Sequence, residues 1–287
     1  MQGEASKALG QAPDIWDTVL ENWRHIGRPL KPYPDDIAVY ERFARVRANE
    51  CTGRLRALML GVTPEIAGCR WPAGTNLIAV DCSPAMIHGL WPAPGTPADA
   101  RVLCADWRTM PIDSGSIDYV CGDGCNPALP FPDVMGAVAR SVLRILAPGG
   151  LFAMRLFSRP EPAETVDDIS RALAAGRIGN VHVLKWRLIA ALTGKVENGV
   201  RLGDVWNVWN GMRSLVARYG AVEGWTAGEL NSIEMYLGME TRFYFPTLAE
   251  YRALLAPDFV ERECSYGPYE LGDRCPIVCF AKRNAPS

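Results

Sequence analysis

Four short apolar runs between residues 54 and 157 decide the fold: ALMLG at 57–61, NLIAV at 76–80, RVLCA at 101–105 and SIDYVCG at 116–122. Each run leads directly into a turn or an aspartate. Short apolar runs bounded in this way are typical of strands buried in a parallel sheet. The carboxyl ends of the strands of an open α/β sheet line a crevice that binds ligands. We therefore expect a small-molecule site at the edge where these runs end.

The sequence on the carboxyl side of these runs predicts the rest of the same sheet. A helix at about 132–146 meets Pro148-Gly149-Gly150, which is a strong helix stop, and a fifth strand follows at 151–157. Three more elements are expected near the end of the chain: a helix at 247–255 and strands at 259–265 and 276–281. Since glycine and proline separate these two strands, we expect them to form an antiparallel hairpin.

Two flanking segments have helical rather than strand patterns. Residues 1–53 predict a helical cap, in which Lys31-Pro-Tyr-Pro34 separates two helices and Asp35 can cap the second. This cap either only covers the sheet or also closes a cofactor pocket. Residues 158–243 predict a helical insertion, which would serve as a lid or substrate region. The core of the fold then consists of residues 54–157 and 244–287.

Composition excludes several classes of function. The chain has 287 residues, enough for one α/β domain with a lid. Its formal net charge is −2, which argues against a nucleic-acid or anionic-membrane partner. No apolar stretch reaches the length of a membrane span, and the N-terminal residues lack the pattern of a signal peptide. We therefore expect a cytoplasmic protein.

The cysteine pattern indicates free thiols rather than disulfides or a metal site. The chain has nine cysteines but no CxxC pair, and only three histidines. Several cysteines fall inside expected strands, as buried thiols of a reducing compartment would. Cys121 and Cys125 could be metal ligands only with a distant partner, and the usual zinc spacings are missing. We expect no bound metal.

Asp81 is the sharpest candidate for a binding residue. It ends an expected buried strand, 20 residues beyond Gly61. A carboxylate in this place can accept hydrogen bonds from both hydroxyls of a ribose. The alternative is that Asp81 caps the helix that Pro84 opens. Because Ser83 can cap that helix itself, we favour the ribose role.

Two further turns carry polar groups at the same edge. Asp106 follows the third strand, where its carboxylate can accept from an exocyclic amine while Trp107 stacks on a purine. A solvated loop aspartate beside a core tryptophan is an equally good interpretation. After the first strand, Thr63 can cap a short helix with Pro64 in its first turn. That helix start would offer backbone donors to a carboxylate, or would be a capped helix only.

The order of these motifs resembles the class I S-adenosylmethionine-dependent methyltransferases, particularly those acting on small molecules. The matching stretches are LMLG at 58–61, AVDCSPAMI at 79–87, CADWRTMPIDSGSIDYV at 104–120 and VARSVLRILAPGGLF at 138–152. YFPTLAEYRALL and the two strands after it also fit the way in which this fold closes. The resemblance covers roughly residues 54–157 and 244–282. It implies an α/β, Rossmann-like sheet of seven strands, mostly parallel with the last strand antiparallel, and helices on both faces.

The resemblance also implies S-adenosyl-L-methionine as cofactor and a role for individual residues. Gly61 would approach the amino-acid end of the cofactor, and Asp81 would hold the ribose. Asp106 would bind the adenine amino group. Further contacts are implied at the adenine for Cys82, Met86 and Trp107, and near the sulfonium and the substrate for Gly122, Asp123 and Gly124.

The first turn departs from the family pattern. Met59 stands where family members usually have an acidic residue, and Thr63 and Glu65 stand in place of two glycines. The cofactor's amine thereby loses its usual carboxylate partner. Glu65 could replace it from the helix side.

We therefore expect an enzyme, a methyltransferase that transfers a methyl group in line to a small molecule. Cofactor chemistry drives such a reaction, and the protein mainly aligns donor and acceptor. Asp123 is the candidate base or acceptor-orienting group, although the role of a turn aspartate in Gly122-Asp123-Gly124 is favoured over catalysis. Two alternatives remain open. One is a non-catalytic protein that binds the cofactor on the same fold, and the other is a nicotinamide-dependent oxidoreductase, against which the missing GxGxxG argues.

Overall fold

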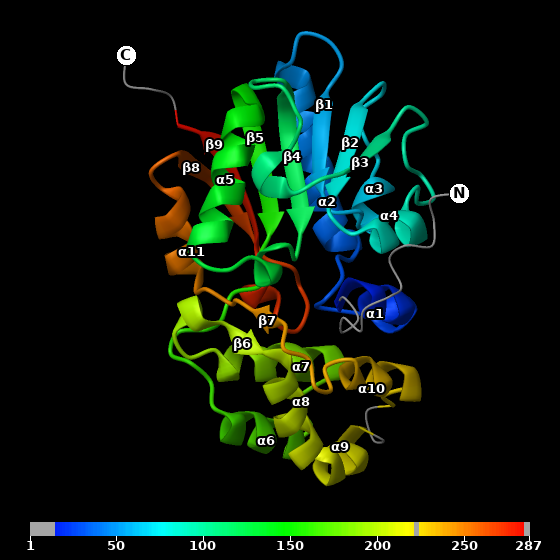
Figure 1. The fold of residues 1–287 in the computed structure, drawn as a ribbon, viewed down its shortest axis with the longest axis vertical. Coiled ribbons are helices and arrows are strands. Elements are labelled where there is room, and N and C mark those ends of the chain that lie inside the picture. Colours follow the sequence, from blue (N-terminus) through cyan, green and yellow to red (C-terminus); the bar gives the residue numbers. More distant parts are fainter. Residues whose placement is uncertain (1–14, 221–223, 284–287) are drawn as a thin grey trace, which may run out of the picture.

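A twisted seven-stranded sheet lies between two helical layers, and a group of further helices packs across one end of it (Figure 1). The computed structural model describes residues 15–220 and 224–283. The strands of the sheet are β1 Arg56–Leu60, β2 Asn76–Asp81, β3 Arg101–Cys104, β4 Ile117–Asp123, β5 Leu146–Arg155, β8 Phe259–Ser265 and β9 Ile277–Lys282. Their order in the sheet is β3-β2-β1-β4-β5-β9-β8.

The strand directions confirm the predicted fold class. Strands β1 to β5 pair in parallel, and β9 pairs antiparallel with both β5 and β8. The strand order reverses between β1 and β4, which are neighbours in space but not in sequence. Ligands of open α/β sheets bind at such a switch point, beyond the carboxyl ends of the strands.

Different helices cover the two faces of the sheet. On one face, α2 Pro34–Glu50 contacts β4, β5 and β9. On the other, α5 Asp133–Ile145 contacts β5 and packs against α11 Leu248–Leu255. Two short helices, α3 Pro64–Ala67 and α4 Pro84–Leu90, follow β1 and β2. Each face therefore has its own hydrophobic core, one on the α2 side and one on the α5 side.

The N-terminal cap and the insertion meet the sheet at the carboxyl ends of its strands (Figure 1). From the cap, α1 Ile15–Asn22 contacts α4. The insertion consists of α6 Val166–Ala174, α7 Val181–Leu192, α8 Leu202–Gly211, α9 Arg213–Gly220, α10 Ala227–Glu234 and the two-stranded pair β6 Val200–Arg201 and β7 Arg242–Phe243. Short 3-10 helices occur at Trp23–His25, Trp107–Thr109, Asn126–Ala128, Val196–Asn198 and Gly272–Arg274.

A chain of aromatic rings joins the insertion to the sheet. The Trp186 ring on α7 lies 5.3 Å from the Phe245 ring, and Phe245 lies 6.1 Å from Phe157 just beyond β5. All three side chains are buried. Aromatic pairs at these distances contribute beyond the area they bury, by about 0.5–1.5 kcal/mol each. The insertion is thus held against the strand ends rather than hanging free of them.

Several element boundaries differ from the sequence-based prediction. Strand β5 begins at Leu146, so Pro148-Gly149-Gly150 lies inside it as an irregularity of the β4–β5 pairing. Gly149 has φ +71°, a conformation that glycine adopts without strain, which lets the segment bulge and continue. Within the insertion, the helical pattern of residues 205–219 belongs to two helices, α8 and α9, separated at Met212. Tyr33 rather than Asp35 is the N-cap of α2, because Pro34 occupies its first position.

The thiols are free but not uniformly buried. None of the nine cysteines, all within the described residues, forms a disulfide. Five of them are buried, whereas Cys82 and Cys104 are exposed. Cys104 lies on β3, which is an edge strand, and Cys82 directly follows β2 beside it. The structure therefore agrees with the expectation of free thiols, several of them buried, and adds two exposed ones at this edge.

The described residues contain neither a candidate membrane-spanning helix nor a cluster of metal-ligating side chains. Across residues 15–220 and 224–283, no helix has the length and apolar character needed to cross a membrane. No group of three metal-ligating side chains occurs in the same part of the chain.

Candidate active site

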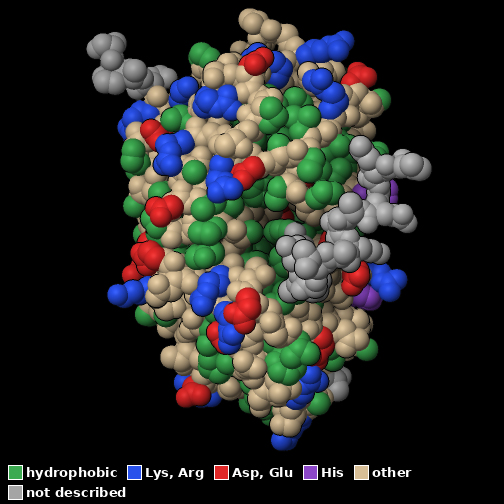
Figure 2. All heavy atoms as spheres, in the orientation of Figure 1, with side chains coloured by type: hydrophobic (Ala, Val, Ile, Leu, Met, Phe, Trp, Pro, Cys, Tyr) green, Lys and Arg blue, Asp and Glu red, His purple; other side chains and the backbone are tan. Residues whose placement is uncertain are grey.

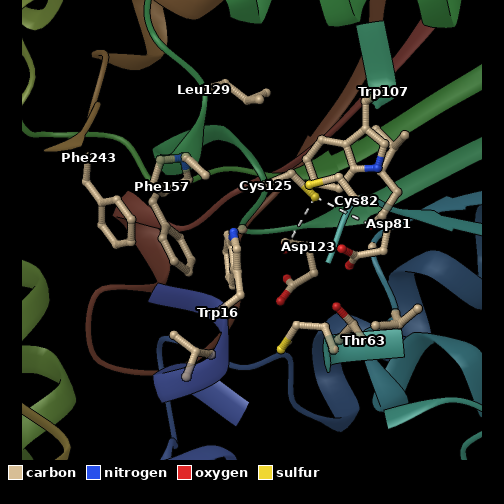
Figure 3. A pocket seen from close by; sticks show the side chains of 18 of the residues that line it. Trp16, Thr63, Asp81, Cys82, Trp107, Asp123, Cys125, Leu129, Phe157 and Phe243 are labelled. Atoms are coloured by element: carbon tan, nitrogen blue, oxygen red, sulfur yellow. Dashed lines mark hydrogen bonds between the residues drawn. The ribbon is translucent and has the colours of Figure 1, made fainter. Parts of the chain in front are cut away.

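A cavity of about 460 Å³ lies at the carboxyl ends of β1, β2 and β4. Its walls come from the sheet, from the cap and from the insertion. In Figure 3, Thr63, Asp81 and Trp107 lie on one side of it, and Trp16, Phe157 and Phe243 on the other. Asp123 and Cys125, from the end of β4 and the turn beyond it, lie between the two groups. The outer view also shows hydrophobic side chains gathered around a hollow between the two halves of the molecule (Figure 2).

The turn after β1 gives the cavity its floor. Gly61 has φ +87°, and its N–H donates to the Val80 carbonyl at 2.8 Å. The same carbonyl accepts from Trp107 Nε1 at 2.6 Å, which fixes the indole beside the turn. A Cβ at Gly61 would lie 3.8 Å from Asp81 Oδ2 and 4.0 Å from Trp107 Cζ2. Glycine therefore allows the turn its backbone conformation and keeps space open between Asp81 and Trp107.

Asp81 ends β2 and faces the cavity without capping the next helix. Its Oδ1 accepts from the Ser83 N–H at 2.8 Å, which orients the carboxylate. The cap of α4 is Ser83, whose Oγ accepts from the Met86 N–H at 3.2 Å. Ser83, and not Asp81, therefore caps α4.

Asp106 lies at the rim of the same cavity but is paired with an arginine. Both its oxygens accept from the Arg108 guanidinium, and Oδ1 also accepts from the Arg108 N–H. Hydrogen bonds from Arg108 lower the pKa of Asp106. Since both side chains are exposed, this ion pair contributes little to stability. Arg108 also lines the cavity, a position that sequence reasoning did not assign to it.

Asp123 belongs to a buried ion pair. The guanidinium of Arg155 on β5 donates to both Asp123 oxygens, and neither side chain is open to solvent. Arg155 also donates to the Pro29 carbonyl at 2.7 Å and to the Tyr269 hydroxyl at 3.3 Å. Burial raises the pKa of Asp123, and the positive charge of Arg155 opposes that rise. The carboxylate is therefore held in place by the cap, by β5 and by the C-terminal loop.

The remaining predicted site residues divide between the cavity and the surrounding structure. Thr63, Cys82 and Met86 line the cavity. Gly122 does not, because it packs against Cys125, Leu60 and Met154, and its carbonyl accepts from the Tyr40 hydroxyl at 2.7 Å. Glu65 also lies outside the lining, with a carboxylate oxygen 4.0 Å from Lys31 Nζ, and burial raises the pKa of Glu65.

The insertion contributes an apolar wall with one amine in it. Met235, Tyr236 and Phe243 line this side, together with Lys185 from α7. Lys185 is 1% exposed, and burial lowers its pKa to about 7. Sequence reasoning did not single out Lys185, because nothing in the local pattern of α7 distinguishes it from a surface lysine.

Comparison with known proteins agrees with this architecture. Residues 60–154 match a family model described as a methyltransferase domain. No curated protein matches the chain in sequence. Among solved structures, one from Rhodobacter sphaeroides bears a name that groups it with the zinc-dependent alcohol dehydrogenases. It is 13% identical, with a TM-score of 0.56, and the match covers 93% of this chain and 98% of that one. A protein from Pyrococcus horikoshii OT3 is 14% identical, with a TM-score of 0.52 over 91% and 98%.

A third structure, a SAM-dependent methyltransferase from Methanosarcina mazei, is 14% identical, with a TM-score of 0.49 over 88% of this chain and 99% of that one. At such identities the likeness shows the fold alone. The family match covers the segment that carries β1 to β5 and the cavity floor. Residues 60–154 therefore match a methyltransferase domain in sequence, and the seven-stranded sheet has the fold of the solved structures it resembles.

Proposed function

We propose that this chain is an S-adenosylmethionine-dependent methyltransferase that acts on a small molecule. The observation that carries the proposal is the convergence of Asp81, Asp106 and Trp107 on one cavity, beside the Gly61 turn of a methyltransferase domain. Such a cavity, with a few polar groups at the switch point of an α/β sheet, is the usual form of a cofactor site.

The residues present fit an adenosine-bearing cofactor. Asp81, oriented by the Ser83 N–H, would accept from the ribose hydroxyls. The space that Gly61 leaves between Asp81 and Trp107 would admit the cofactor backbone. Trp107 would lie against the adenine. Asp106 would accept a hydrogen bond from the adenine amino group, in place of one that it accepts from Arg108. When bound, the cofactor supplies an electrophilic methyl group on a sulfonium.

The chain's own contribution would be alignment and exclusion of water. The acceptor half of the cavity is bounded by Phe157, Tyr236 and Phe243, whose apolar rings would displace water from beside the reacting atoms. Asp123 would orient the acceptor rather than remove its proton, because Arg155 already neutralises its charge. In-line displacement gains most from such positioning.

The size and chemistry of the cavity favour a small acceptor. A volume of about 460 Å³ lies at the lower end of the range for drug-sized ligand sites. Cofactor and acceptor would have to share it, so a macromolecular acceptor could insert no more than a side chain or a base. Nine free thiols are consistent with action in a reducing compartment such as the cytoplasm.

Calorimetry with S-adenosylmethionine, S-adenosylhomocysteine and NAD tests the proposal. We expect both sulfur compounds to bind and NAD not to bind. Asp81→Ala should weaken binding of S-adenosylhomocysteine by roughly ten- to hundredfold, the loss of hydrogen bonds to a charged group. Asp113→Ala removes an exposed carboxylate outside this cavity and should change nothing. Binding of NAD alone, or equal affinity in the Asp81 and Asp113 variants, would refute the assignment.

Turnover is measured separately, as release of S-adenosylhomocysteine in the presence of a panel of small hydroxyl, amine and thiol acceptors. We expect at least one of them to be methylated. Tight cofactor binding with no product from any acceptor would instead support a binding protein on this fold.

A further inference from the structure

Lys185 is a buried amine on the acceptor side of the cavity. It lies on α7 and is 1% exposed, yet it lines the cavity beside Met235 and Tyr236. A lysine this deeply buried is rare unless it is paired or has a function. Burial is the cause of the shift in its pKa, and no carboxylate of the described residues is among the causes. Its environment therefore does not favour a permanent positive charge.

The hydrogen bonds of Lys185 show how much of its amine is already engaged within the protein. Nζ lies 2.9 Å from the Ser232 carbonyl oxygen and 3.4 Å from Ser232 Oγ. The Ser232 hydroxyl donates its own proton to the Glu229 carbonyl at 2.5 Å, so Oγ can only accept from Lys185. Both contacts are thus N–H donations from the amine. A neutral amine has two N–H groups, and when Ser232 accepts from both, the lone pair stays available to a ligand in the cavity that Lys185 lines.

We propose that Lys185 is the proton acceptor for an apolar, aromatic methyl acceptor that carries an acidic hydroxyl group, such as a phenol or an enol. This inference rests on the proposed function and names the substrate class of the same site. The apolar walls select the ring, since Phe157, Phe243 and Leu129 surround the space that would hold it (Figure 3). The Lys185 amine would then accept a hydrogen bond from the hydroxyl group, which is the polar substituent of such a ring.

The charged and titratable groups around Lys185 are compatible with this role. His182, one turn earlier on α7, has a pKa lowered to about 4, chiefly by burial, so it is neutral near pH 7. Burial also raises the pKa of Tyr236, whose ring centroid lies 4.9 Å from Nζ. Glu229 is engaged with Thr226 at the start of α10, and Asp123 across the cavity is paired with Arg155.

Burial lowers the pKa of Lys185 to about 7, and no other group contributes to that shift. A general base is most effective when its pKa lies near the working pH. In the reaction, the acceptor's O–H bond breaks and its proton forms an N–H bond to Lys185. The oxygen's electron pair forms the bond to the methyl carbon as the sulfur–methyl bond breaks. Positive charge thus moves from the sulfonium to the Lys185 ammonium, which releases its proton to water once product leaves.

Binding of 4-nitrophenol tests the inference without turnover, because its anion absorbs at a longer wavelength than the neutral phenol. The full-length protein, saturated with S-adenosylhomocysteine, is titrated with 4-nitrophenol from about pH 5.5 to 8, across the range in which Lys185 should titrate. We expect the bound probe to be ionised at pH values where the free probe is neutral. Lys185→Met should abolish this spectral shift and weaken binding at the lower pH roughly ten- to hundredfold, as loss of a charge-assisted hydrogen bond does.

Two controls separate the outcomes. Lys195→Met removes an exposed lysine of the insertion and should behave as the wild type. The methyl ether 4-nitroanisole has no proton to give and should bind equally to the wild type and to Lys185→Met. If 4-nitroanisole binds but 4-nitrophenol stays neutral, or if Lys185→Met leaves the shift intact, the inference is wrong. Failure of both probes to bind would refute the substrate class.

Two further results distinguish this inference from the proposed function. If 4-nitrobenzoate binds with the same dependence on Lys185 while 4-nitrophenol stays neutral, Lys185 anchors an anion and the inference fails. If S-adenosylhomocysteine does not bind, the proposed function fails, and the spectral shift of 4-nitrophenol in the protein without cofactor still decides the role of Lys185.

Discussion

Replacement of Lys185 by methionine should remove a specific pH dependence from the stability of this protein. Burial lowers the pKa of Lys185 from 10.5 to about 7 in the folded chain. Between those two values the unfolded chain holds a proton on this side chain that the folded chain does not. Stability therefore rises with pH from about 7 to 10.5, because the unfolded state binds more protons throughout that window.

The magnitude follows from the size of the shift. Each unit of pKa difference corresponds to about 1.4 kcal/mol, so the full effect of Lys185 is on the order of 5 kcal/mol. About 1 kcal/mol of this increase in the free energy of unfolding is expected between pH 7 and 8, because proton binding to the two states differs there. Thiols of the unfolded chain begin to ionise in this interval, but they are the same in both proteins and cancel in the difference. The pKa of the neighbouring His182, about 4, lies well below the interval. Lys185 should therefore dominate the difference between wild type and variant there.

Urea unfolding of the wild type and of Lys185→Met at pH 7 and at pH 8 gives the comparison. The free energy of unfolding of the wild type should rise by about 1 kcal/mol more than that of the variant. A constant offset is also expected, because methionine leaves the Ser232 carbonyl without its donor. That offset does not depend on pH and leaves the slope readable. Lys195→Met should follow the wild type. Parallel curves for wild type and Lys185→Met would show that Lys185 keeps an ordinary pKa.

Two further substitutions test the cavity floor and the buried ion pair. Gly61→Ala should lower the free energy of unfolding by about 1–2 kcal/mol, because Gly61 has φ +87°, and should weaken binding of S-adenosylhomocysteine. Gly115→Ala, at φ +67°, should lower the free energy of unfolding by a similar amount but leave binding unchanged in calorimetry. Arg155→Met should lower the urea-unfolding free energy by about 3–5 kcal/mol, because it leaves the Asp123 carboxylate buried without a partner. Arg171→Met breaks an exposed pair and should cost no more than about 1 kcal/mol, and an equal loss in both variants would contradict this account.

Local patterns were sufficient to predict the sheet. Each parallel strand is a short apolar run, and each run ends where the chain turns at the carboxyl edge. The hairpin of β8 and β9 followed from the glycine and proline between two such runs. Where the prediction was wrong, at Pro148-Gly149-Gly150, a turn signal that usually stops a helix lies within a strand as a bulge. Pairing with β4 decides whether this segment forms a turn or a bulge within a strand, and the local sequence carries no information about that pairing.

The polar residues of the cavity floor were predictable for the same reason, since residues that end adjacent parallel strands meet at one edge. Asp81, Asp106 and Trp107 all line the cavity. Their partners were not predictable. The pairing of Asp106 with Arg108 depends on a side-chain rotamer, and the insertion places Lys185 at the cavity through contacts between α7 and α10 that no periodicity shows.

The pairing of Asp123 with Arg155 has a signal in the sequence. Arg155 lies in LFAMRLF, an apolar run that predicts a strand buried on both faces. An arginine inside such a strand is almost never buried without a carboxylate partner. Parallel pairing of β4 with β5 places Asp123 directly opposite Arg155, so the strand order alone identifies the partner. A carboxylate neutralised in this way is better suited to hold its neighbours in place than to remove a proton. The base that we propose for a hydroxyl acceptor is therefore Lys185, which lines the same cavity from the insertion.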